Sequence, residues 1–574
     1  MARLPFIHEY VIERLVGLKG GAAIYRSLAR LREAGLLATI KPPLYPCGSQ
    51  ELYYLTDLGL ATLAIDHGVE LVDLVNPLHL GGRQLLSLLP HLEHLVAAYD
   101  LLGALAASRE IPPVLLAWER PHRCRYQRPT AKAQVSVKVP AYVALSWDGE
   151  PGAYFLVPDR GTVPLRLYRP LIQHLFAMRH MEYETFPILV VATWGERRKE
   201  LWEKMLDEVR RERNDFDLLA QITLWGELRS GLTCTEQLNR VQTLSVAQLR
   251  QHIPARRLTP RRSNGPLPRP VGDALLAPRH PPVLDDLEQV ALHLCLGDYE
   301  LLDLLAEHPF LPPERMAIVL GGSVRSVRRR RNRLLATRLM RLLEAEEIGD
   351  DAGLELPELT AAGLERVAAH RGLSPAVAVR EVGLVGGGPG QPFEARRRLL
   401  THLTHTMGAD EIFVRLYQIA GRLRESGGDD AVLEWQNTTA CSRHHLRPDG
   451  YGLYQRHGWL HHLFVEYDRG TMRQRGYLHK FDEYHRYNFG GRYERDYGRY
   501  PVILMVTSSN TSEERIARVA QIAAGYWGRQ LPLLLICQWR VDEASNFRGL
   551  LGPIWREPGA DFGERRFWLA DKSL

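Results

Sequence analysis

One short pattern occurs twice in the chain, and this repetition limits the possible folds more than any other feature. Phe155–Thr162 reads FLVPDRGT and Phe464–Thr471 reads FVEYDRGT, so the opening Phe and the closing DRGT are shared. The later stretch carries Glu466 where the earlier one has Val157. Repeated segments of this kind indicate a fold assembled from two similar parts.

Four further pairs of motifs recur in the same order along the chain. They are YRSLARLREAGLL and RRRRNRLLATRLM, YLTDLGL and ELTAAGL, HLEHL and HLTHT, and AWE and EWQ, which begin at Tyr25 and Arg328, Tyr54 and Glu358, His91 and His402, and Ala117 and Glu434. Each pair alone is weak, but the shared order predicts an internal duplication. We call the two parts the first copy and the second copy.

A proline- and arginine-rich segment at 251–284 separates the copies and reads as a linker, because it has no hydrophobic periodicity. A length of 574 residues allows several domains of about 100–200 residues each. No apolar run approaches the ~20 residues that cross a bilayer, and the six cysteines form no CxxC pair. We therefore expect a cytoplasmic protein without a membrane span, a disulfide framework or a zinc ribbon.

The second copy opens with three predicted helices. Asp298–His308 has apolar residues at helical spacing, and Leu311–Gly322 starts with prolines and ends with glycines. The third helix follows Ser323, which can cap it, and 340–364 then reads as a hairpin and a closing helix. Short helices, a basic third helix and a hairpin resemble a winged helix-turn-helix, whose third helix enters the DNA major groove.

Arginines crowd the third predicted helix and are the expected contacts to double-stranded DNA. They are Arg325, Arg328, Arg329, Arg330, Arg331 and Arg333, with Arg26 and Arg30 in the first copy. Such arginines mostly contact phosphates, which gives affinity but little base specificity. The net charge of +6 also favours an anionic partner. A solvated helix face, or a patch for RNA or a membrane, is the alternative interpretation.

Carboxylates gather in the second copy. Leu463–Asp468 is apolar enough for a central strand, and a period of two puts Glu466 and Asp468 on one face. Two like charges on a buried strand are costly unless a cation shares them. Asp449 on a neighbouring strand adds a third carboxylate, and Glu434 is a further candidate acid. Oxygen ligands of this kind suit Mg²⁺ or Mn²⁺.

Lys480 is the only lysine within 205–571, in a chain that otherwise uses arginine. A compact ammonium can orient a water molecule or neutralise charge that builds up on a phosphate. A capping motif that begins at Thr471 predicts a helix through this region. On that helix Tyr477 and Tyr484 share the face of Lys480, which places all three beside the predicted carboxylates.

This constellation resembles the PD-(D/E)xK, or restriction-endonuclease-like, nucleases. Pro448-Asp449 matches the PD of that motif, and Glu466 matches its second acid. Asp468 stands where the motif has its lysine. Some branches of the superfamily carry the basic residue on the next helix, so the resemblance assigns that role to Lys480. It implies catalysis by these side chains with Mg²⁺ or Mn²⁺.

The order of the motifs is most similar to the replication-relaxation family of plasmids and other mobile elements. That order is a winged helix ending in LTxxGL, a helix with HxxH-like histidines, and then PDG, ExDRGT and KxxxY. The similarity covers about Asp298–Cys537 and, more loosely, the first copy. It implies a replication or relaxation protein whose partners are double-stranded DNA and other replication or mobilisation proteins.

The expected fold is a multidomain α/β and α+β chain, pseudo-dimeric within itself. It has two tandem copies of a winged helix-turn-helix followed by a restriction-endonuclease-like α/β domain, and the first copy is degenerate. The expected domains are a winged helix at 1–75, a degenerate nuclease domain at 85–250, the linker at 251–284, a winged helix at 285–380 and a nuclease domain at 393–574.

Comparing the copies separates chemical positions from structural ones. The pairs are Asp449 with Ala141, Glu466 with Val157, Lys480 with about Leu171, and Glu434 with Ala117. All four replacements are apolar, so the first copy is predicted to be a pseudonuclease. Asp468 is retained as Asp159, which leaves it either a metal ligand or a structural acid that pairs with Arg469 or bonds to the next helix. His405 is retained as His94, which favours packing over catalysis.

Three functions remain open. The first is a metal-dependent DNA endonuclease with one live site, which would nick duplex DNA as a monomer. The second is a relaxase with a tyrosine nucleophile, drawn from Tyr477, Tyr484, Tyr487, Tyr493, Tyr497 and Tyr500. The third is a DNA-binding initiator or regulator without catalysis. A covalent protein–DNA adduct identifies the second, and binding without metal-dependent cleavage identifies the third.

Overall fold

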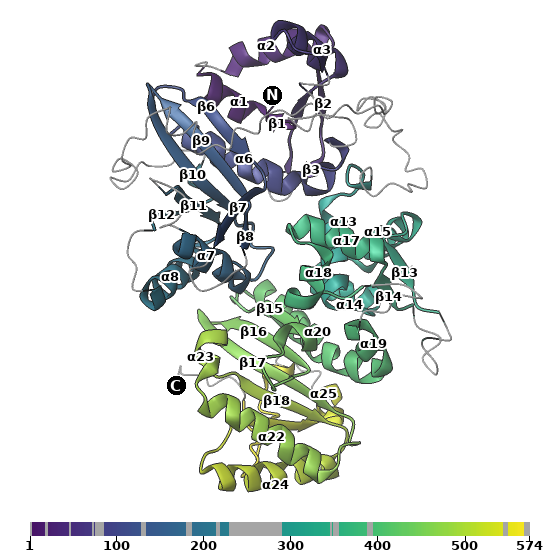
Figure 1. Cartoon of the computed structure of the whole chain (residues 1–574). Helices are drawn as coiled ribbons and strands as arrows, with labels where there is room; N and C mark the ends of the chain where they lie inside the picture. The colour runs from purple at the N-terminus through teal and green to yellow at the C-terminus, as the bar shows by residue number, and fades with distance from the viewer. Residues whose placement is uncertain are drawn as a thin grey trace. The chain divides into compact units, whose positions relative to one another are not determined.

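The computed structural model shows a mixed α/β protein with several separate sheets (Figure 1). It describes residues 3–17, 21–44, 48–71, 74, 85–127, 134–178, 186–213, 218–228, 290–344, 347, 355–386, 394–543 and 549–567. The expected linker at 251–284 lies outside these residues. The chain divides into two compact units, Met1–Leu296 with Ala369–Leu373 and Gly297–Ala368 with Ser374–Leu574.

The first copy begins with two helices and a small antiparallel sheet. Its elements are β1 (Ile7–His8), α1 (Glu9–Val16), α2 (Gly21–Glu33), β2 (Leu37–Ile40), β3 (Pro43–Leu44), β4 (Gly48–Ser49), β5 (Leu52–Leu55) and α3 (Asp57–Asp66). The sheet has the order β1-β5-β2, and β3 pairs with β4. Apolar faces of α1 and α2 pack on this sheet through Val11, Ile24 and Leu28, which are buried in one core.

The second copy begins with the helices and hairpin expected from its sequence. The elements are α13 (Leu296–Glu307), α14 (Pro313–Val319), α15 (Val324–Ala336), β13 (Met340–Leu342), β14 (Pro357–Leu359) and α17 (Ala361–Arg371). The hydroxyl of Ser323 accepts the backbone N–H of Ser326 at 3.2 Å, so this serine caps α15 as predicted. β13 and β14 pair antiparallel, with Met340 opposite Leu359.

The LTxxGL motif has the same geometry in both copies. The hydroxyls of Thr56 and Thr360 accept the backbone N–H of Gly59 and Gly363, each at 3.1 Å, and begin the closing helix. A Cβ atom added to Gly59 would stand 2.1 Å from a backbone carbonyl oxygen, and one added to Gly363 would stand 2.0 Å from its counterpart. Only glycine lets the helix approach the residue before β2 or β13 this closely, which explains the repeated motif.

Each copy continues into a five-stranded sheet with the same strand order. In the first copy the order is β12-β11-β10-β9-β6. The elements are α6 (Leu92–Ala106), β6 (Val114–Glu119), β7 (His122–Gln127), β8 (Gln134–Val139), β9 (Ala141–Trp147), β10 (Glu150–Pro158), α7 (Arg169–Met178), β11 (Ile188–Thr193), α8 (Glu196–Arg213) and β12 (Ala220–Leu224). β7 and β8 form a separate hairpin.

The sheet of the second copy has the order β15-β16-β17-β18-β19 (Figure 1). Its elements are α19 (Glu394–Thr401), α20 (Leu403–Glu425), β15 (Ala431–Asn437), α21 (Thr438–Cys441), β16 (Gly450–Arg456), β17 (Trp459–Asp468), α22 (Gln474–Phe489), α23 (Arg492–Tyr497), β18 (Val502–Thr507), α24 (Asn510–Trp527), β19 (Leu533–Cys537) and α25 (Gln538–Glu543). β15, β16 and β17 run antiparallel, and β18 and β19 continue the sheet in parallel with β17. β6, β9, β10, β11 and β12 repeat these directions.

The strand registers align the two sheets residue by residue. A register shift lies between Leu115 and Ala117 in β6 and between Val432 and Glu434 in β15, so Ala117 does correspond to Glu434. This irregularity is a shared bulge, and bulges are specific features of a fold. Its repetition supports the duplication that the short motifs predicted.

One sequence-based correspondence is wrong by a residue. Ala141 pairs with Leu156, and in the second copy Gly450 pairs with Val465, so Ala141 corresponds to Gly450. The residue equivalent to Asp449 is therefore Pro140. The sequence alignment placed the proline of VPAYVAL beside the proline of RPDGYGL, which shifted the strand by one position. Proline has no side-chain ligand, so the loss of the carboxylate stands.

Helices cover both faces of the second sheet. α22 and α24 bury Tyr477, Tyr484 and Ile516 against Phe464 and Ile503 of the strands. α20 packs against β15, β16 and β17 on the other face. Alternate residues of β17 therefore face different helices, and the face that carries Glu466 and Asp468 looks toward α22.

The predicted helix start at Thr471 is wrong. α22 begins at Gln474 with Arg473 as its N-cap residue, and no side chain caps it. Thr471 is exposed in the turn before the helix. The glycine at position 470 has φ +76, so a left-handed turn lies directly before the threonine, and Met472 and Arg473 separate the threonine from the first helical residue. The rest of the prediction holds, because α22 carries Lys480, Tyr477 and Tyr484.

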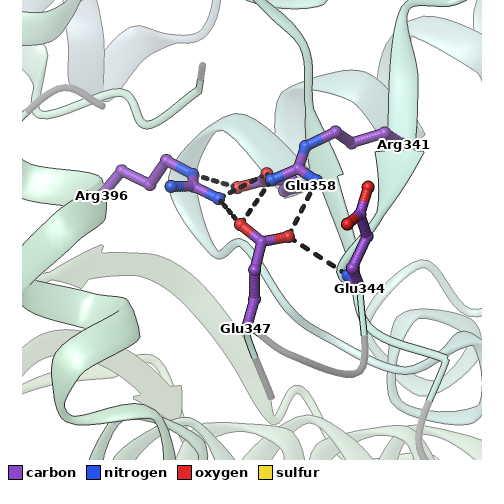
Figure 2. Close-up of polar contacts among 5 residues, drawn as sticks. All are labelled: Arg341, Glu344, Glu347, Glu358 and Arg396. Atoms are coloured by element: carbon purple, nitrogen blue, oxygen red, sulfur yellow. Dashed lines mark hydrogen bonds and ion pairs between the residues drawn. The ribbon is translucent and has the colours of Figure 1, made fainter. Parts of the chain in front are cut away.

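A buried cluster of ion pairs joins the hairpin β13–β14 to α19 (Figure 2). Arg396 donates from Nε to Glu358 at 2.6 Å and from Nη2 to Glu347 at 2.9 Å. Arg341 donates to both oxygens of Glu347 at 2.9 Å and also pairs with Glu358. The bond from Arg341 lowers the pKa of Glu347 to about 2. Two guanidiniums and two carboxylates balance, so the cluster fixes the hairpin without an unpaired buried charge.

The expectations about disulfides and membrane spans can be compared only with the residues that the structure describes. Cys124, Cys441 and Cys537 are buried free thiols, and Cys295 is a partly buried one. None of the helices in the described ranges is both long and apolar enough to cross a membrane.

Candidate active site

The centre of the candidate site is a buried ion pair between β17 and α22. Glu466 is 1% exposed, and its Oε2 pairs with the Nζ of Lys480. Tyr484, one helical turn after Lys480, donates its hydroxyl to Oε1 at 2.5 Å. Both oxygens of the glutamate are therefore held, and they face the helix that the sequence predicted. The structure brings Glu466 and Lys480 together, as the motif resemblance implied.

Asp449 lies beside this pair at the edge of the sheet, just before β16. Its Oδ2 accepts the backbone N–H of Tyr467 at 2.8 Å, and its Oδ1 lies 3.0 Å from Nε2 of His405 on α20. The aspartate side chain is 16% exposed and the histidine side chain 32%, so the site opens to solvent on this side. The sheet ends at this point, so side chains from the helices on its two faces, such as His405 of α20 and Lys480 of α22, both lie near Asp449.

Charges within the site alter each other's protonation. Burial raises the pKa of Glu466 to about 8, and the negative charge of Asp449 adds to that shift while Lys480 opposes it. Burial works in the same direction on Asp449, but Lys480 and His405 outweigh it and lower its pKa to about 2. Burial disfavours charged Lys480, yet Glu466 and Asp449 raise its pKa above the ordinary value. The two carboxylates thus differ in proton affinity, as in paired acid sites.

His405 is a site residue that the sequence comparison assigned to packing. Burial lowers the proton affinity of its ring, but the bond to Asp449 and the charge of that aspartate raise its pKa overall. A signal was present in the sequence, because His405 lies on the helix that precedes the PD-like motif. Retention of His94 in the first copy masked that signal.

Asp468 makes its own hydrogen bonds outside the ion pair. Its Oδ2 accepts the backbone N–H of Gly470 at 3.1 Å, and its Oδ1 accepts the hydroxyl of Tyr477 at 2.8 Å. Both oxygens stabilise the turn between β17 and α22. The suggested ion pair with Arg469 is absent from the described contacts, and that arginine is exposed. The geometry gives Asp468 a structural role in this turn.

Asp159 occupies the equivalent turn in the first copy with different partners. It is fully buried, and Arg198 donates to both of its oxygens, at 2.6 and 2.8 Å. Trp202 donates its indole N–H at 2.6 Å, and the backbone N–H of Gly161 donates at 3.1 Å. Arg160, the counterpart of Arg469 in the first copy, pairs with Glu93 at 3.0 Å rather than with Asp159.

Two other sets of predicted residues do not join the site. Glu434 is exposed on β15 and accepts from Gln436 at 2.5 Å. The tyrosines are mostly packing groups, and four of them are buried: Tyr477, Tyr484, Tyr487 and Tyr497. Tyr493 and Tyr500 are partly buried against the same core.

The arginines of α15 divide into surface and buried groups. Arg325, Arg328 and Arg329 are exposed, and Arg328 pairs with Glu314 at 2.6 Å. Arg331 is 7% exposed and pairs with Glu355. Of the remaining predicted contacts, Arg330 is partly buried, Arg333 pairs with buried Asp298 at 2.6 Å, and Arg26 and Arg30 on α2 are exposed.

The predicted metal site depends on the carboxylates of Asp449 and Glu466. Among the described residues, no group of three or more His, Cys, Asp or Glu side chains is arranged as a metal centre. Asp449 and Glu466 are the two predicted acids that the structure brings together, and hydrogen bonds or ion pairs engage both oxygens of each. Asp468 lies in the turn before α22, where its two oxygens accept from Gly470 and Tyr477.

One family model matches the chain, in two stretches that follow the two copies. The replication-relaxation model matches residues 6–173 and 302–503, which together exceed half of the chain. The second stretch contains Asp449, Glu466 and Lys480. Comparison with curated proteins and comparison with solved structures gave no match.

Proposed function

Because the chain belongs to the replication-relaxation family, we propose that it is a DNA-binding, metal-dependent phosphodiesterase of a plasmid or other mobile element. The family description indicates a role in replication or relaxation. The observation that carries the proposed chemistry is the buried Glu466–Lys480 pair beside Asp449. A buried carboxylate with a strongly shifted pKa, next to a second acid and an ammonium, is typical of catalytic sites.

The site residues support hydrolysis of a phosphodiester. Asp449 and Glu466 would hold Mg²⁺ or Mn²⁺, which when bound lowers the pKa of a water and offsets charge on the phosphate. Lys480 would neutralise phosphate charge; its side chain is 21% exposed, and its Nζ contacts Glu466. Tyr484 holds Oε1 of Glu466 and fixes the orientation of that carboxylate. His405 holds the other acid from the opposite helix.

Exposed arginines support binding to duplex DNA. In this proposal α14, α15 and the hairpin β13–β14 act as a winged helix-turn-helix, with α15 in the major groove. Arg325 and Arg329 are exposed on α15 and make no ion pair among the described residues. They are therefore available for phosphates, whereas Arg331 supports the fold through Glu355.

The proposal gives the first copy a supporting role. Pro140 and Val157 stand where the second copy has Asp449 and Glu466, so only one copy offers the carboxylates. A monomer with one live site cuts one strand of duplex DNA. The product expected from a supercoiled plasmid is thus the nicked circle.

The test is cleavage of supercoiled plasmid by the full chain with Mg²⁺ or Mn²⁺, and with EDTA. We expect metal-dependent nicking by the native protein. Glu466→Gln removes the charge and the Lys480 pairing, and the rate should fall by about 10²–10³-fold, the usual cost of losing one catalytic electrostatic group. Glu514→Gln, on an exposed glutamate of α24, is the matched control and should keep the native rate.

Other outcomes separate the competing functions. Full activity in Glu466→Gln contradicts the site assignment. Salt-sensitive DNA binding without any metal-dependent cleavage identifies a non-catalytic binding protein. A covalent protein–DNA adduct identifies a tyrosine nucleophile.

A further inference from the structure

The ends of α22 and α24 carry aromatic side chains that point into solvent. The two helices lie side by side over one face of the second sheet (Figure 1). Phe489 is the last residue of α22 and is 82% exposed, and Tyr526, next to the last residue of α24, is 85% exposed. Large aromatic rings usually contribute to a core or an interface, so two of them left in water at one place indicate a binding surface.

Trp527 joins the exposed rings into one surface. Its ring stacks on His485 with the centroids 5.6 Å apart, and it contacts Phe489 at 6.2 Å and Tyr526 at 6.0 Å. Its indole N–H donates to Asp482 at 3.0 Å, which fixes the orientation of the ring. We call these four rings the aromatic patch. The two exposed rings therefore stand on an anchored base.

Arginines flank the aromatic patch. Arg486, Arg492 and Arg529 are exposed, and Arg492 begins α23 directly after the turn that ends α22. Burial lowers the pKa of His485, and the charge of nearby Arg529 lowers it further. Arg486 pairs with Asp482 at 2.8 Å, whereas the side chains of Arg492 and Arg529 have no partner among the described residues. The patch thus combines bare aromatic faces with unpaired positive charge.

The first copy carries a charged residue where the patch has one of its exposed rings. α8 and α24 have 18 residues each, and they begin at the same distance from the strand before them, which ends at Thr193 or Thr507. This alignment places Glu212 opposite Tyr526. Glu212 pairs with Arg169 at 2.5 Å. The fold therefore does not require an aromatic ring at this position.

We propose that the aromatic patch binds single-stranded DNA, with bases stacked on Phe489 and Tyr526 and phosphates held by Arg492 and Arg529. Proteins that hold single strands combine aromatic side chains with basic ones in this way, because every base has a flat face and every nucleotide a negative charge. Duplex DNA is a poor fit, since its bases are already stacked on one another. The unpaired arginines favour a polyanion over an apolar protein surface. This inference goes beyond the proposed duplex binding and cleavage and depends on neither.

Fluorescence anisotropy of a labelled single-stranded thymidine oligonucleotide tests this inference. The full chain is titrated in EDTA, which prevents metal-dependent cleavage, and with excess unlabelled duplex, which occupies the arginines of α15. Phe489→Ala and Tyr526→Ala should each weaken binding at least about fivefold, the lower end of the cost of losing one base stack. Tyr526→Phe keeps the ring and should bind as the native protein does. Trp459→Ala removes a ring on β17 that is 60% exposed, and as the matched control it should also keep the native affinity.

The arginines give a second measurement. Arg529→Gln should make the slope of log affinity against log salt shallower by about 0.7, the contribution of one phosphate contact on a single strand. Arg495→Gln changes an exposed arginine that already pairs with Asp496, and it should leave the slope unchanged.

The possible results separate this inference from the nuclease proposal. Native affinity in the double variant Phe489→Ala/Tyr526→Ala, with the native thermal melting curve, overturns the inference and leaves the nuclease proposal standing. If that variant keeps its affinity but sediments as a smaller species than the native chain, the patch joins copies of the chain, and the inference is again overturned. Binding of the single strand through the patch without any cleavage in Mg²⁺ supports the inference and contradicts only the nuclease proposal.

Discussion

The two five-stranded sheets of this protein share one architecture but differ in the residues near one end of their central strands. They share strand order, strand direction, the bulge in the outer strand and the turn that follows the central strand. In the second copy Asp449 and Glu466 lie there, facing Lys480 of α22, and in the first copy Pro140 and Val157 take the places of the two acids. The fold therefore does not need the carboxylates. Their burial in the second copy costs free energy, which is consistent with the function proposed for this site.

The aspartate that is retained in both copies, Asp159 and Asp468, also separates what the fold needs from what the proposed chemistry needs. Asp159 and Asp468 both accept the N–H of the turn glycine, but the first copy adds Arg198 and the second adds Tyr477. The turn requires an acid in both copies, whether or not chemistry takes place nearby. The side chain that bonds to this acid is a charged arginine in the first copy and a neutral tyrosine in the second.

The largest expected effect on stability comes from removing Arg198. Arg198→Ala leaves Asp159 fully buried without its cation, and breaking a buried pair in this way costs about 3–5 kcal/mol. Hydrogen exchange followed by mass spectrometry should show faster exchange in β10 and α8. Tyr477→Phe is the matched change in the second copy, and it should cost only about 1–3 kcal/mol, since one neutral donor to a buried acid is lost. Equal costs in the two copies would contradict this account of the turn.

A smaller effect is expected in the pH dependence of stability. The pKa of Asp410, a buried acid of α20, is raised to about 8 in the folded chain, above its value of about 3.8 when unfolded, so folding favours its protonated form. This contribution is complete below pH 4 and is lost as the pH rises towards 8. Asp410→Asn should therefore flatten the fall of the urea midpoint between pH 5 and about pH 8. Some slope remains, because Glu466 is shifted in the same direction.

Tyr99→Phe is the counterpart of this change in the first copy, because Tyr99 and Asp410 each lie eight residues after the N-cap residue of their helix, α6 or α20. Burial raises the pKa of Tyr99 above its ordinary value, so it does not titrate in this range. The variant should lower stability slightly at every pH without altering the slope. Tyr99 and Asp410 are thus expected to differ in their effect on the pH dependence of stability. A changed slope in Tyr99→Phe, or an unchanged slope in Asp410→Asn, would contradict this expectation.

Sequence reasoning found the parts of the site that depend on local pattern. Alternation along β17 gave the face of Glu466, and helical spacing put Lys480 and Tyr484 opposite it. It missed the burial of Asp410, because an acid on an amphipathic helix looks like a surface residue until the neighbouring segments are placed. It also missed the one-residue shift at Pro140, since a register between strands is set by pairing over their whole length.

The DNA-binding arginines show a similar limit. A run of arginines on one helix reads as a single basic surface, but 3.6 residues per turn must direct some of them inward. Arg331 is one of these inward-facing residues, and in α2 of the first copy buried Leu28 takes its place. Leu28 lies seven residues before Gly35, and Arg331 lies seven residues before Arg338. Gly35 and Arg338 both have positive φ and end the two helices in the same way, which fixes this alignment.

The smallest expected effect separates surface arginines from buried ones. Arg329→Gln removes an exposed charge, so the slope of log affinity for duplex DNA against log salt should become shallower by about 1. Arg331→Leu restores the residue type of the first copy at a buried position, and it should leave that slope unchanged because Arg331 is engaged by Glu355. Fluorescence anisotropy with a labelled duplex over a range of salt concentrations measures both. If Arg331→Leu makes the slope as shallow as Arg329→Gln does, then Arg331 must leave Glu355 and contact a phosphate. In that case all the arginines of the helix contribute to DNA binding, as the sequence alone predicted.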